Sequence, residues 1–250
     1  MIKLLISDLD DTLYDWTGFF VPAFYAMADE IARMTGIDEK KLLNEYMAAH
    51  QRLGSVEYPY ATLELPSIKA YYNNAPAEEM KAALRPAFNV FNSVRESHLH
   101  LLPGVEEMLC ALTEMGVTLI AYTESSKENG FYRLMKLGIE PYFKHVYTFE
   151  SQFKSAYAVS EKVRTVQTKK PDVAVIGRIC TGEGYDKSEV MYLGDNLTKD
   201  MYMAKMAGVT AVWMHRKCEN EDYKNKLLAI TSWTAAEYAR DVEPVTRTVD

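Results

Sequence analysis

Two short acidic motifs each follow an apolar run in this sequence. Asp8 and Asp10 come directly after IKLLIS, and Asp195 and Asp200 lie in GDNLTKD, directly after VMYL. Carboxylates that crowd into one site repel one another unless a cation lies between them. Mg²⁺ prefers hard oxygen ligands and keeps positions open for water or for a phosphate oxygen. Together the two motifs therefore favour a magnesium site that handles phosphate.

Each acidic motif also has a simpler interpretation. An acidic turn after a strand is usually exposed to solvent, and an Asp that opens a helix, as Asp195 would, often serves only to cap that helix. A calcium-binding EF-hand loop that starts at Asp8 is excluded by its spacing. The sixth and twelfth positions of such a loop would be Leu13 and Phe19, where the loop needs Gly and Glu.

A hydroxyl group and an amine complete the candidate set. Thr123 follows the apolar run VTLIAY, and Lys170 precedes Pro171. Taken singly, neither carries much information, because Thr is common at strand ends and Lys is usually a surface charge. Lys169 and Lys154 are rivals of Lys170, and the following proline favours Lys170. In combination, the carboxylates would bind a cation while the hydroxyl and the ammonium group bind a phosphate.

The elements that would position these residues are short buried strands that alternate with helices. Such alternation predicts an α/β fold with a Rossmann-like parallel sheet. Parallel sheets bind ligands beyond the carboxyl ends of their strands, which is where both acidic motifs and Thr123 fall. Continuous apolar runs predict the buried strands at residues 2–7, 117–122, 146–149, 190–193 and 210–214.

The stretch between the first two of these strands is mostly helical. Apolar residues recur at helical spacing over 16–35. A second helix is predicted to begin at Asp38 and to end near Gly54. A further helical stretch over 77–100 is predicted to be interrupted at Pro86, because proline cannot continue a helix without a kink.

The helical stretch predicts two domains. Residues 1–14 and 103–250 would form the Rossmann-like core, and residues 15–102 would form an inserted, mostly helical cap domain. Within the core, residues 172–188 include ICTGEGYDKS, whose glycines and polar residues predict a loop.

Composition restricts the class of protein and its partners. The 250 residues are 48% hydrophobic and 25% charged, as in ordinary globular proteins, and the net charge of −7 argues against binding to nucleic acid. No apolar run reaches the length of about 18 residues that a membrane span needs. The three cysteines are widely separated, which argues against a disulfide framework. The first predicted strand leaves no room for a signal peptide, so we expect a cytoplasmic protein.

The ordered set of motifs resembles the haloacid dehalogenase superfamily. Its four motifs match DxDxT at residues 8–12, the strand-terminal Thr123, Lys170 followed by proline, and GDNxxxD at residues 194–200. The helical insertion lies between the first and second motifs and resembles the C1 cap of this superfamily. The stretch DLDDTLY is similar to the subfamily that includes pyrimidine 5′-nucleotidase-like and phosphoglycolate phosphatase-like enzymes.

The resemblance implies a magnesium-dependent phosphatase that hydrolyses a small phosphorylated metabolite. Asp8 would attack the phosphorus and form an aspartyl phosphate. Asp10 would give a proton to the leaving alkoxide and then take one from the water that hydrolyses the intermediate. Thr123 and Lys170 would bind the oxygens of the phosphate.

The same resemblance implies a set of metal ligands. Mg²⁺ would be held by Asp8, by the backbone carbonyl of Asp10 and by Asp195. Asp200 would orient a metal-bound water molecule or Lys170.

Two alternatives to a phosphatase stay open at this point. Dehalogenases and phosphonatases lack an acid at the position of Asp10, so this residue favours cleavage of a phosphate ester. Phosphomutases keep the acid, and a sugar phosphomutase is one alternative. The other is a non-catalytic protein of the same fold that binds only Mg²⁺ or a partner.

Overall fold

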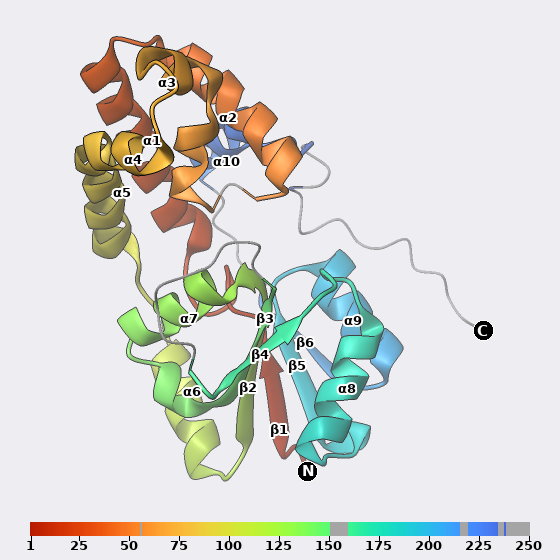
Figure 1. Ribbon diagram of the computed structural model, residues 1–250. Helices are drawn as coiled ribbons and strands as arrows, with labels where there is room; N and C mark the ends of the chain where they lie inside the picture. Colours follow the sequence, from red (N-terminus) through yellow and green to blue (C-terminus); the bar gives the residue numbers. More distant parts are fainter. Residues whose placement is uncertain (56, 151–159, 216–219, 235–237, 239–250) are drawn as a thin grey trace. The chain divides into compact units, whose positions relative to one another are not determined.

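The chain forms two compact units. The computed structural model describes all residues except 56, 151–159, 216–219, 235–237 and 239–250 (Figure 1). The described residues of Met1–Asp15 and His100–Lys217 belong to the first unit, and those of Trp16–Leu99 and Cys218–Tyr238 belong to the second.

A parallel sheet forms the centre of the first unit. Among the described residues it has six strands in the order β4-β3-β2-β1-β5-β6. β1 (Leu4–Ser7) is completely buried and lies between β2 (Thr118–Ser126) and β5 (Val190–Gly194). This arrangement confirms the predicted Rossmann-like α/β fold. The outer strands are β3 (Phe143–Phe149), β4 (Val163–Val166) and β6 (Thr210–Trp213).

One hydrophobic cluster of this unit lies between the sheet and the helices α8 (Val173–Glu183) and α9 (Tyr202–Ala207). Alternate residues of β1, Leu4 and Ile6, share one buried cluster with Ile176 and Ile179. This pattern follows from geometry, since side chains of a strand alternate between the two faces of a sheet. The helices of the unit are α6 (Val105–Glu114), α7 (Lys127–Lys136), α8 (Val173–Glu183) and α9 (Tyr202–Ala207), as Figure 1 shows.

The second unit is helical, and its local signals act as predicted. The Asp38 side chain accepts a hydrogen bond from Lys41 N at 3.0 Å and caps α2, and Gly54 ends that helix with a φ of 67°. Pro86 lies in the first turn of α5, where its missing N–H group costs nothing. The helices before the second strand are α1 (Trp16–Thr35), α2 (Glu39–Leu53), α3 (Pro66–Tyr71), α4 (Ala77–Ala83) and α5 (Arg85–His98).

One further helix, α10 (Glu221–Ile230), also belongs to the second unit, although the predicted core extends to residue 250. The hydroxyl of Tyr25 in α1 donates to Lys226 O at 2.9 Å, and Leu227 and Ile230 are fully buried. The structure therefore differs from the predicted boundary. An amphipathic helix shows which of its faces is buried, but its sequence does not show which surface it packs against.

The loop predicted for residues 172–188 is wrong for Val173–Glu183, which form α8. Asp172 caps this helix by accepting a hydrogen bond from Ala174 N at 2.9 Å. The glycines at 177 and 182 disfavour a helix locally, but Ile176, Ile179 and Cys180 are buried at helical spacing. Burial of this apolar stripe outweighs the low helix propensity of the glycines.

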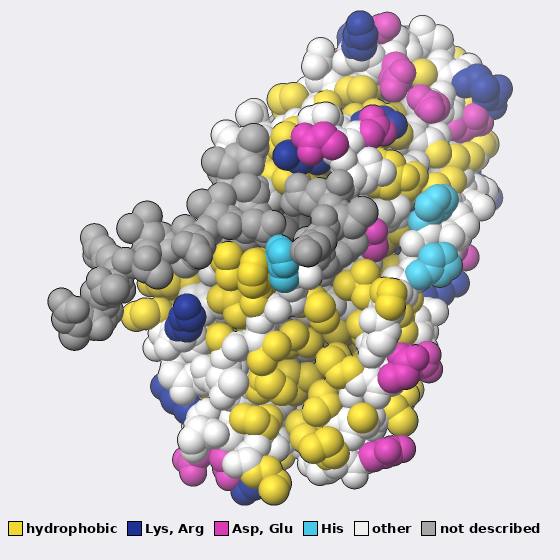
Figure 2. Space-filling model, turned by 180° about the vertical axis from the view of Figure 1, so that it is seen from behind, with side chains coloured by type: hydrophobic (Ala, Val, Ile, Leu, Met, Phe, Trp, Pro, Cys, Tyr) yellow, Lys and Arg dark blue, Asp and Glu magenta, His cyan; other side chains and the backbone are white. Residues whose placement is uncertain are grey.

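No described helix has the length and apolar character needed to cross a membrane. On the face drawn in Figure 2, the described Lys and Arg side chains are scattered among acidic ones and do not gather into one basic patch.

Candidate active site

Two neighbouring strands bring the two acidic motifs together. Asp8 directly follows β1, and Asp195 directly follows β5. The strands are parallel and in register, with Ser7 opposite Leu193. Asp8 N continues the pairing by donating a hydrogen bond to Leu193 O at 2.8 Å. Residues 187 positions apart in the chain, which is 195 minus 8, therefore meet at the carboxyl edge of the sheet.

The carboxylates of Asp8, Asp195 and Asp200 form a buried acidic cluster. One carboxylate oxygen from each lies within 4.8 Å of the others. Asp200 reaches the cluster from the π-helical turn Leu197–Met201, and its Oδ2 accepts a hydrogen bond from Asn196 N at 3.2 Å. This cluster contains three of the four predicted acidic residues. The side chain of the fourth, Asp10, turns to different partners.

A glycine makes room for this arrangement. A Cβ atom added to Gly194 would lie 2.6 Å from both Cβ and Cγ of Asp200, closer than such atoms ever approach. Only glycine therefore fits at this position while Asp200 points into the cluster. The sequence motif GDNLTKD thus encodes the packing of the site as well as its carboxylates.

Lys170 supplies the positive charge of the cluster. Its ammonium group donates to Asp8 Oδ1 and, at 2.9 Å, to Asp200 Oδ1. Burial alone would lower the pKa of Lys170, but the charges of Asp200 and Asp8 raise it well above its usual range. Lys170 is therefore a permanent cation here. Of its two rivals, Lys169 places its Nζ 5.4 Å from the centre of the Phe149 ring, and Lys154 lies outside the described residues.

The Asp8 carboxylate is held from both sides. Thr12 Oγ1 donates to Asp8 Oδ2 at 3.0 Å, opposite the contact from Lys170 to Oδ1. Burial raises the pKa of Asp8 well above its usual range. The ammonium group of Lys170 opposes this effect, whereas the negative charge of Asp200 adds to it. The metal-free site therefore holds more negative charge than Lys170 balances.

Asp10 and Thr123 belong to a second group of side chains beside the cluster. Thr123 Oγ1 donates to Asp10 Oδ2 at 3.2 Å. Two residues that sequence reasoning missed also contact Asp10. Ser125 Oγ donates to Asp10 Oδ2 at 2.8 Å, and Arg133 Nη1 donates to Asp10 Oδ1 at 2.7 Å. In the structure Arg133 lies on the buried face of α7 with Gly130 and Leu134, which the helix sequence alone does not reveal.

The model of the family described as haloacid dehalogenase-like hydrolase matches residues 5–214. The chain belongs to this family. The match includes both acidic motifs, Thr123 and Lys170, together with the helical insertion between the first two strands.

Individual relatives of this haloacid dehalogenase-like hydrolase are distant but cover most of its length. It is 26% identical to the glyceraldehyde 3-phosphate phosphatase of Pyrococcus abyssi, over 85% of this chain and 81% of that protein. It is 24% identical to the phosphoserine phosphatase of Thermus thermophilus, over 88% and 92% of the two chains. The crystal structure of a 2-haloacid dehalogenase from Pseudomonas syringae shares the fold, with a TM-score of 0.58, 23% identity and coverage of 88% and 91%.

The acidic cluster of this haloacid dehalogenase-like hydrolase fits a hard divalent cation. Its three carboxylates are buried and face one ammonium group, so a further positive charge would balance them. Carboxylate oxygens are the ligands that Mg²⁺ prefers. Asp200 already accepts hydrogen bonds from Lys170, Tyr192 and Asn196. Asp8 and Asp195 are therefore better suited to direct contact with a metal ion.

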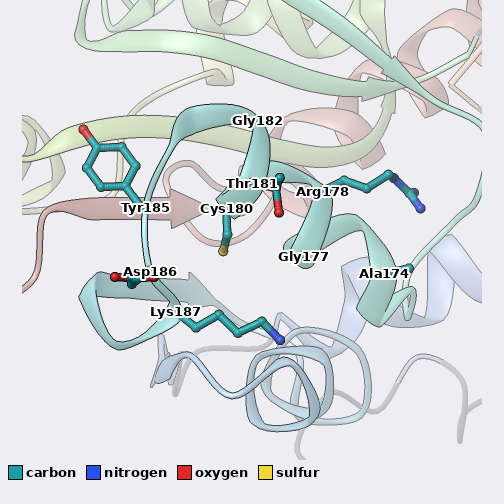
Figure 3. A pocket seen from close by; sticks show the side chains of 9 residues that line it. All are labelled: Ala174, Gly177, Arg178, Cys180, Thr181, Gly182, Tyr185, Asp186 and Lys187. Carbon is teal, nitrogen blue, oxygen red and sulfur yellow. The ribbon is translucent and has the colours of Figure 1, made fainter.

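A separate hollow of about 870 Å³ lies on the first unit, between α8 and the segment that follows it (Figure 3). Tyr185, which lines it, hydrogen-bonds to Thr118 at the start of β2, and Lys187 lies just before β5. The hollow is therefore near the amino ends of the strands, at the opposite edge of the sheet from the carboxylates. None of the predicted site residues lines it.

Proposed function

We propose that this protein is a magnesium-dependent phosphatase that hydrolyses small phosphate monoesters through an aspartyl phosphate on Asp8. The observation that carries the proposal is the position of the Asp8 carboxylate. Lys170 and Thr12 fix its two oxygens, and it lies beside Asp195 at the carboxyl edge of the sheet. A fixed carboxylate next to a buried cation and a candidate metal site is suited to attack on an anionic phosphate.

Asp8, Asp195 and the backbone carbonyl of Asp10 would hold Mg²⁺. When bound, the metal ion would neutralise charge on the phosphate oxygens. Lys170 reduces the repulsion between two anions, because its ammonium group contacts the Asp8 carboxylate directly. Asp200 keeps Lys170 in place by accepting its second hydrogen bond.

The first chemical step transfers the phosphoryl group to Asp8. A carboxylate oxygen of Asp8 attacks the phosphorus, and the bond between phosphorus and the ester oxygen breaks. Asp10, which takes a proton from water after the substrate binds, gives that proton to the leaving oxygen, which departs as an alcohol. Thr123 donates its hydroxyl to a phosphate oxygen, which requires that this hydroxyl leave Asp10.

The second step restores the enzyme. A water molecule attacks the phosphorus of the aspartyl phosphate, and the bond between phosphorus and the Asp8 oxygen breaks. Asp10, now ionised, accepts the proton of that water molecule. The products are inorganic phosphate and free enzyme, so the cycle is a hydrolysis and consumes no other reactant.

The substrate is a small phosphorylated metabolite. Relatives named glyceraldehyde 3-phosphate phosphatase and phosphoserine phosphatase, each matched over most of its length, support this substrate class. The helical insertion is proposed to act as the cap that selects the leaving group. Its place in the chain, between the first and second motifs, supports this role.

The decisive experiment compares Asp8→Asn with wild-type protein on 4-nitrophenyl phosphate in the presence of Mg²⁺. We expect wild-type turnover to release inorganic phosphate and the variant to lose about 10³-fold or more of kcat, because an amide cannot act as the nucleophile. Asp186→Asn is the matched control, because this exposed Asp lies in the segment that lines the hollow. Turnover by Asp8→Asn at the wild-type rate would refute the assignment. A second assay with a hexose phosphate would indicate a mutase if it gave an isomeric hexose phosphate without release of inorganic phosphate.

A further inference from the structure

Both oxygens of the Asp10 carboxylate are held by a pair of residues that the sequence motifs do not include. Arg133 Nη1 lies 2.7 Å from Asp10 Oδ1 and 3.0 Å from Ser125 Oγ. Ser125 Oγ in turn lies 2.8 Å from Asp10 Oδ2. The three side chains close a triangle, in which the serine hydroxyl accepts from the guanidinium and donates to the carboxylate.

Arg133 is buried, with 4% of its side chain exposed, whereas Asp10 is 24% exposed. A buried guanidinium needs a compensating negative charge, which ionised Asp10 provides in the substrate-free protein. The planar guanidinium group can donate from several fixed directions, which suits it to holding a carboxylate in one orientation. The Asp10 side chain is therefore partly exposed to solvent, whereas the guanidinium group of Arg133 that contacts it is buried.

Close packing of α7 sets the position of Arg133. One turn earlier in this helix, a Cβ atom added to Gly130 would lie 3.2 Å from Cγ2 of Thr123. The helix backbone therefore approaches the end of β2 closely at Gly130, and the next turn carries Arg133 to Asp10. The packing of the helix against the strand thus fixes the backbone at Arg133, and its hydrogen bonds to Asp10 and Ser125 orient the side chain.

The third contact of Asp10, with Thr123, differs from the other two. The Thr123 hydroxyl has a single proton, which it now donates to Asp10 over 3.2 Å. In the proposed phosphatase, this proton goes to the phosphate, so Thr123 no longer holds Asp10 when substrate is bound. The contacts from Arg133 and Ser125 compete with no phosphate oxygen in that scheme.

We propose that Arg133, acting with Ser125, is the positioning residue that aims the Asp10 carboxyl group at the leaving oxygen of the substrate. The inference rests on the proposed phosphatase function and adds to it a role for α7. Proton transfer needs a donor and an acceptor separated by about 2.6–3.2 Å. Loss of Arg133 lets the Asp10 side chain rotate among its rotamers, so that this distance is met less often.

Leaving groups of different basicity provide the test. A nitrophenolate leaves without a proton, whereas an unsubstituted phenolate is more basic and gains more from protonation. The measurement is kcat/KM for 4-nitrophenyl, 4-chlorophenyl and phenyl phosphate, which have similar shapes. We expect Arg133→Met to raise the ratio of the nitrophenyl to the phenyl value by about tenfold or more relative to wild type. Arg133→Lys, which keeps the charge, should restore part of the wild-type ratio.

Two further variants separate positioning from a structural effect. Ser125→Ala should shift the same ratio in the same direction, and it keeps the buried charge pair if Arg133→Met fails to fold. Arg178→Met is the matched control, because it removes a 60% exposed cation from α8 and should leave the ratio unchanged. A general loss of folded protein would lower all three substrates equally and would not change the ratio.

A double-mutant cycle completes the test. Because Arg133 acts through Asp10, Arg133→Met should change the ratio no further when Asp10→Asn is already present. The inference would be overturned if Arg133→Met changed the ratio as much in the Asp10→Asn background as in wild type. It would also be overturned if Arg133→Met lowered kcat/KM equally for all three substrates and Ser125→Ala left the ratio unchanged. Failure of the proposed phosphatase function would give a different result. Wild-type protein would then hydrolyse none of the three esters in the presence of Mg²⁺, and both proposals would be refuted.

Discussion

Lys170 Nζ donates a hydrogen bond to Asp200 Oδ1 over 2.9 Å, and only 3% of each side chain is exposed. The same ammonium group also contacts Asp8, so one lysine links the end of β1 to the turn after β5. A lysine side chain has four rotatable bonds, and a buried partner such as Asp200 restricts them. The position of the charge beside Asp8 therefore depends on a residue that need not touch the substrate.

Asp200→Asn tests this dependence. The amide keeps the shape of the side chain but removes the charge that holds Lys170, so kcat should fall by about 10–100-fold. The free energy of unfolding should fall by about 1–3 kcal/mol, because a buried charge-assisted hydrogen bond is weakened. Phosphatase assays and urea unfolding measure the two effects. Unchanged values for both would show that Asp200 does not position Lys170.

Gly194→Ala should also displace the Asp200 side chain. The new methyl group would overlap Asp200, whose neighbours prevent it from moving away freely. We expect a loss of about 1–3 kcal/mol in unfolding free energy and reduced activity. Gly177→Ala is the matched control, because nothing lies within 4 Å of the added atom and alanine favours the helix. That variant should be as stable as wild type or more so, and equal effects of the two changes would contradict the packing argument.

Asp195→Ala should weaken the binding of Mg²⁺ without unfolding the protein. Removal of this candidate ligand should raise the Mg²⁺ concentration for half-maximal activity by about tenfold or more. It should also abolish the increase in unfolding temperature that saturating Mg²⁺ gives to wild-type protein. Differential scanning fluorimetry with and without Mg²⁺ measures this increase. A variant that Mg²⁺ stabilises as strongly as wild type would argue against Asp195 as a ligand.

The raised pKa of Asp8 predicts how pH affects the metal-free protein. Burial makes the folded state hold this proton more tightly than the unfolded state does. The resulting stability is fully present below the unfolded pKa of about 3.9, and it is lost as pH rises through the raised folded value. Asp8→Asn cannot ionise, so its stability relative to wild type should increase over that pH range. Urea unfolding with a chelator present measures this difference, and a difference that is flat or falls with pH would contradict it.

Residues whose signals are local were well predicted from the sequence. Asp38 and Gly54 bound a helix as expected, and the apolar run before Asp8 forms a buried parallel strand. The polar ends of β1 and β5 meet because parallel strands align their carboxyl ends, which needs no knowledge of distant packing. For this reason, Asp8 and Asp195 could be paired from the sequence.

Features that depend on tertiary packing were not predicted. α8 forms despite Gly177 because Ile176 and Ile179 are buried against the sheet. α10 belongs to the second unit, whose other helices lie far from it in the sequence. Arg133 was missed for a related reason. An arginine on a helix is usually exposed, and only the fold shows that this one points inward to Asp10.

The central place of β1 in the sheet has a consequence for synthesis of the protein. β1 is synthesised before the other described strands of its sheet, yet its neighbours are β2, which begins at Thr118, and β5, which begins at Val190. Both edges of β1 can therefore be paired only when Val190, which is 186 positions after Leu4 (190 minus 4), has been synthesised. Contacts this distant in the chain slow folding. The nascent chain can bring Asp8 beside Asp195 only after the helical insertion and the strands β2 to β5 have been synthesised.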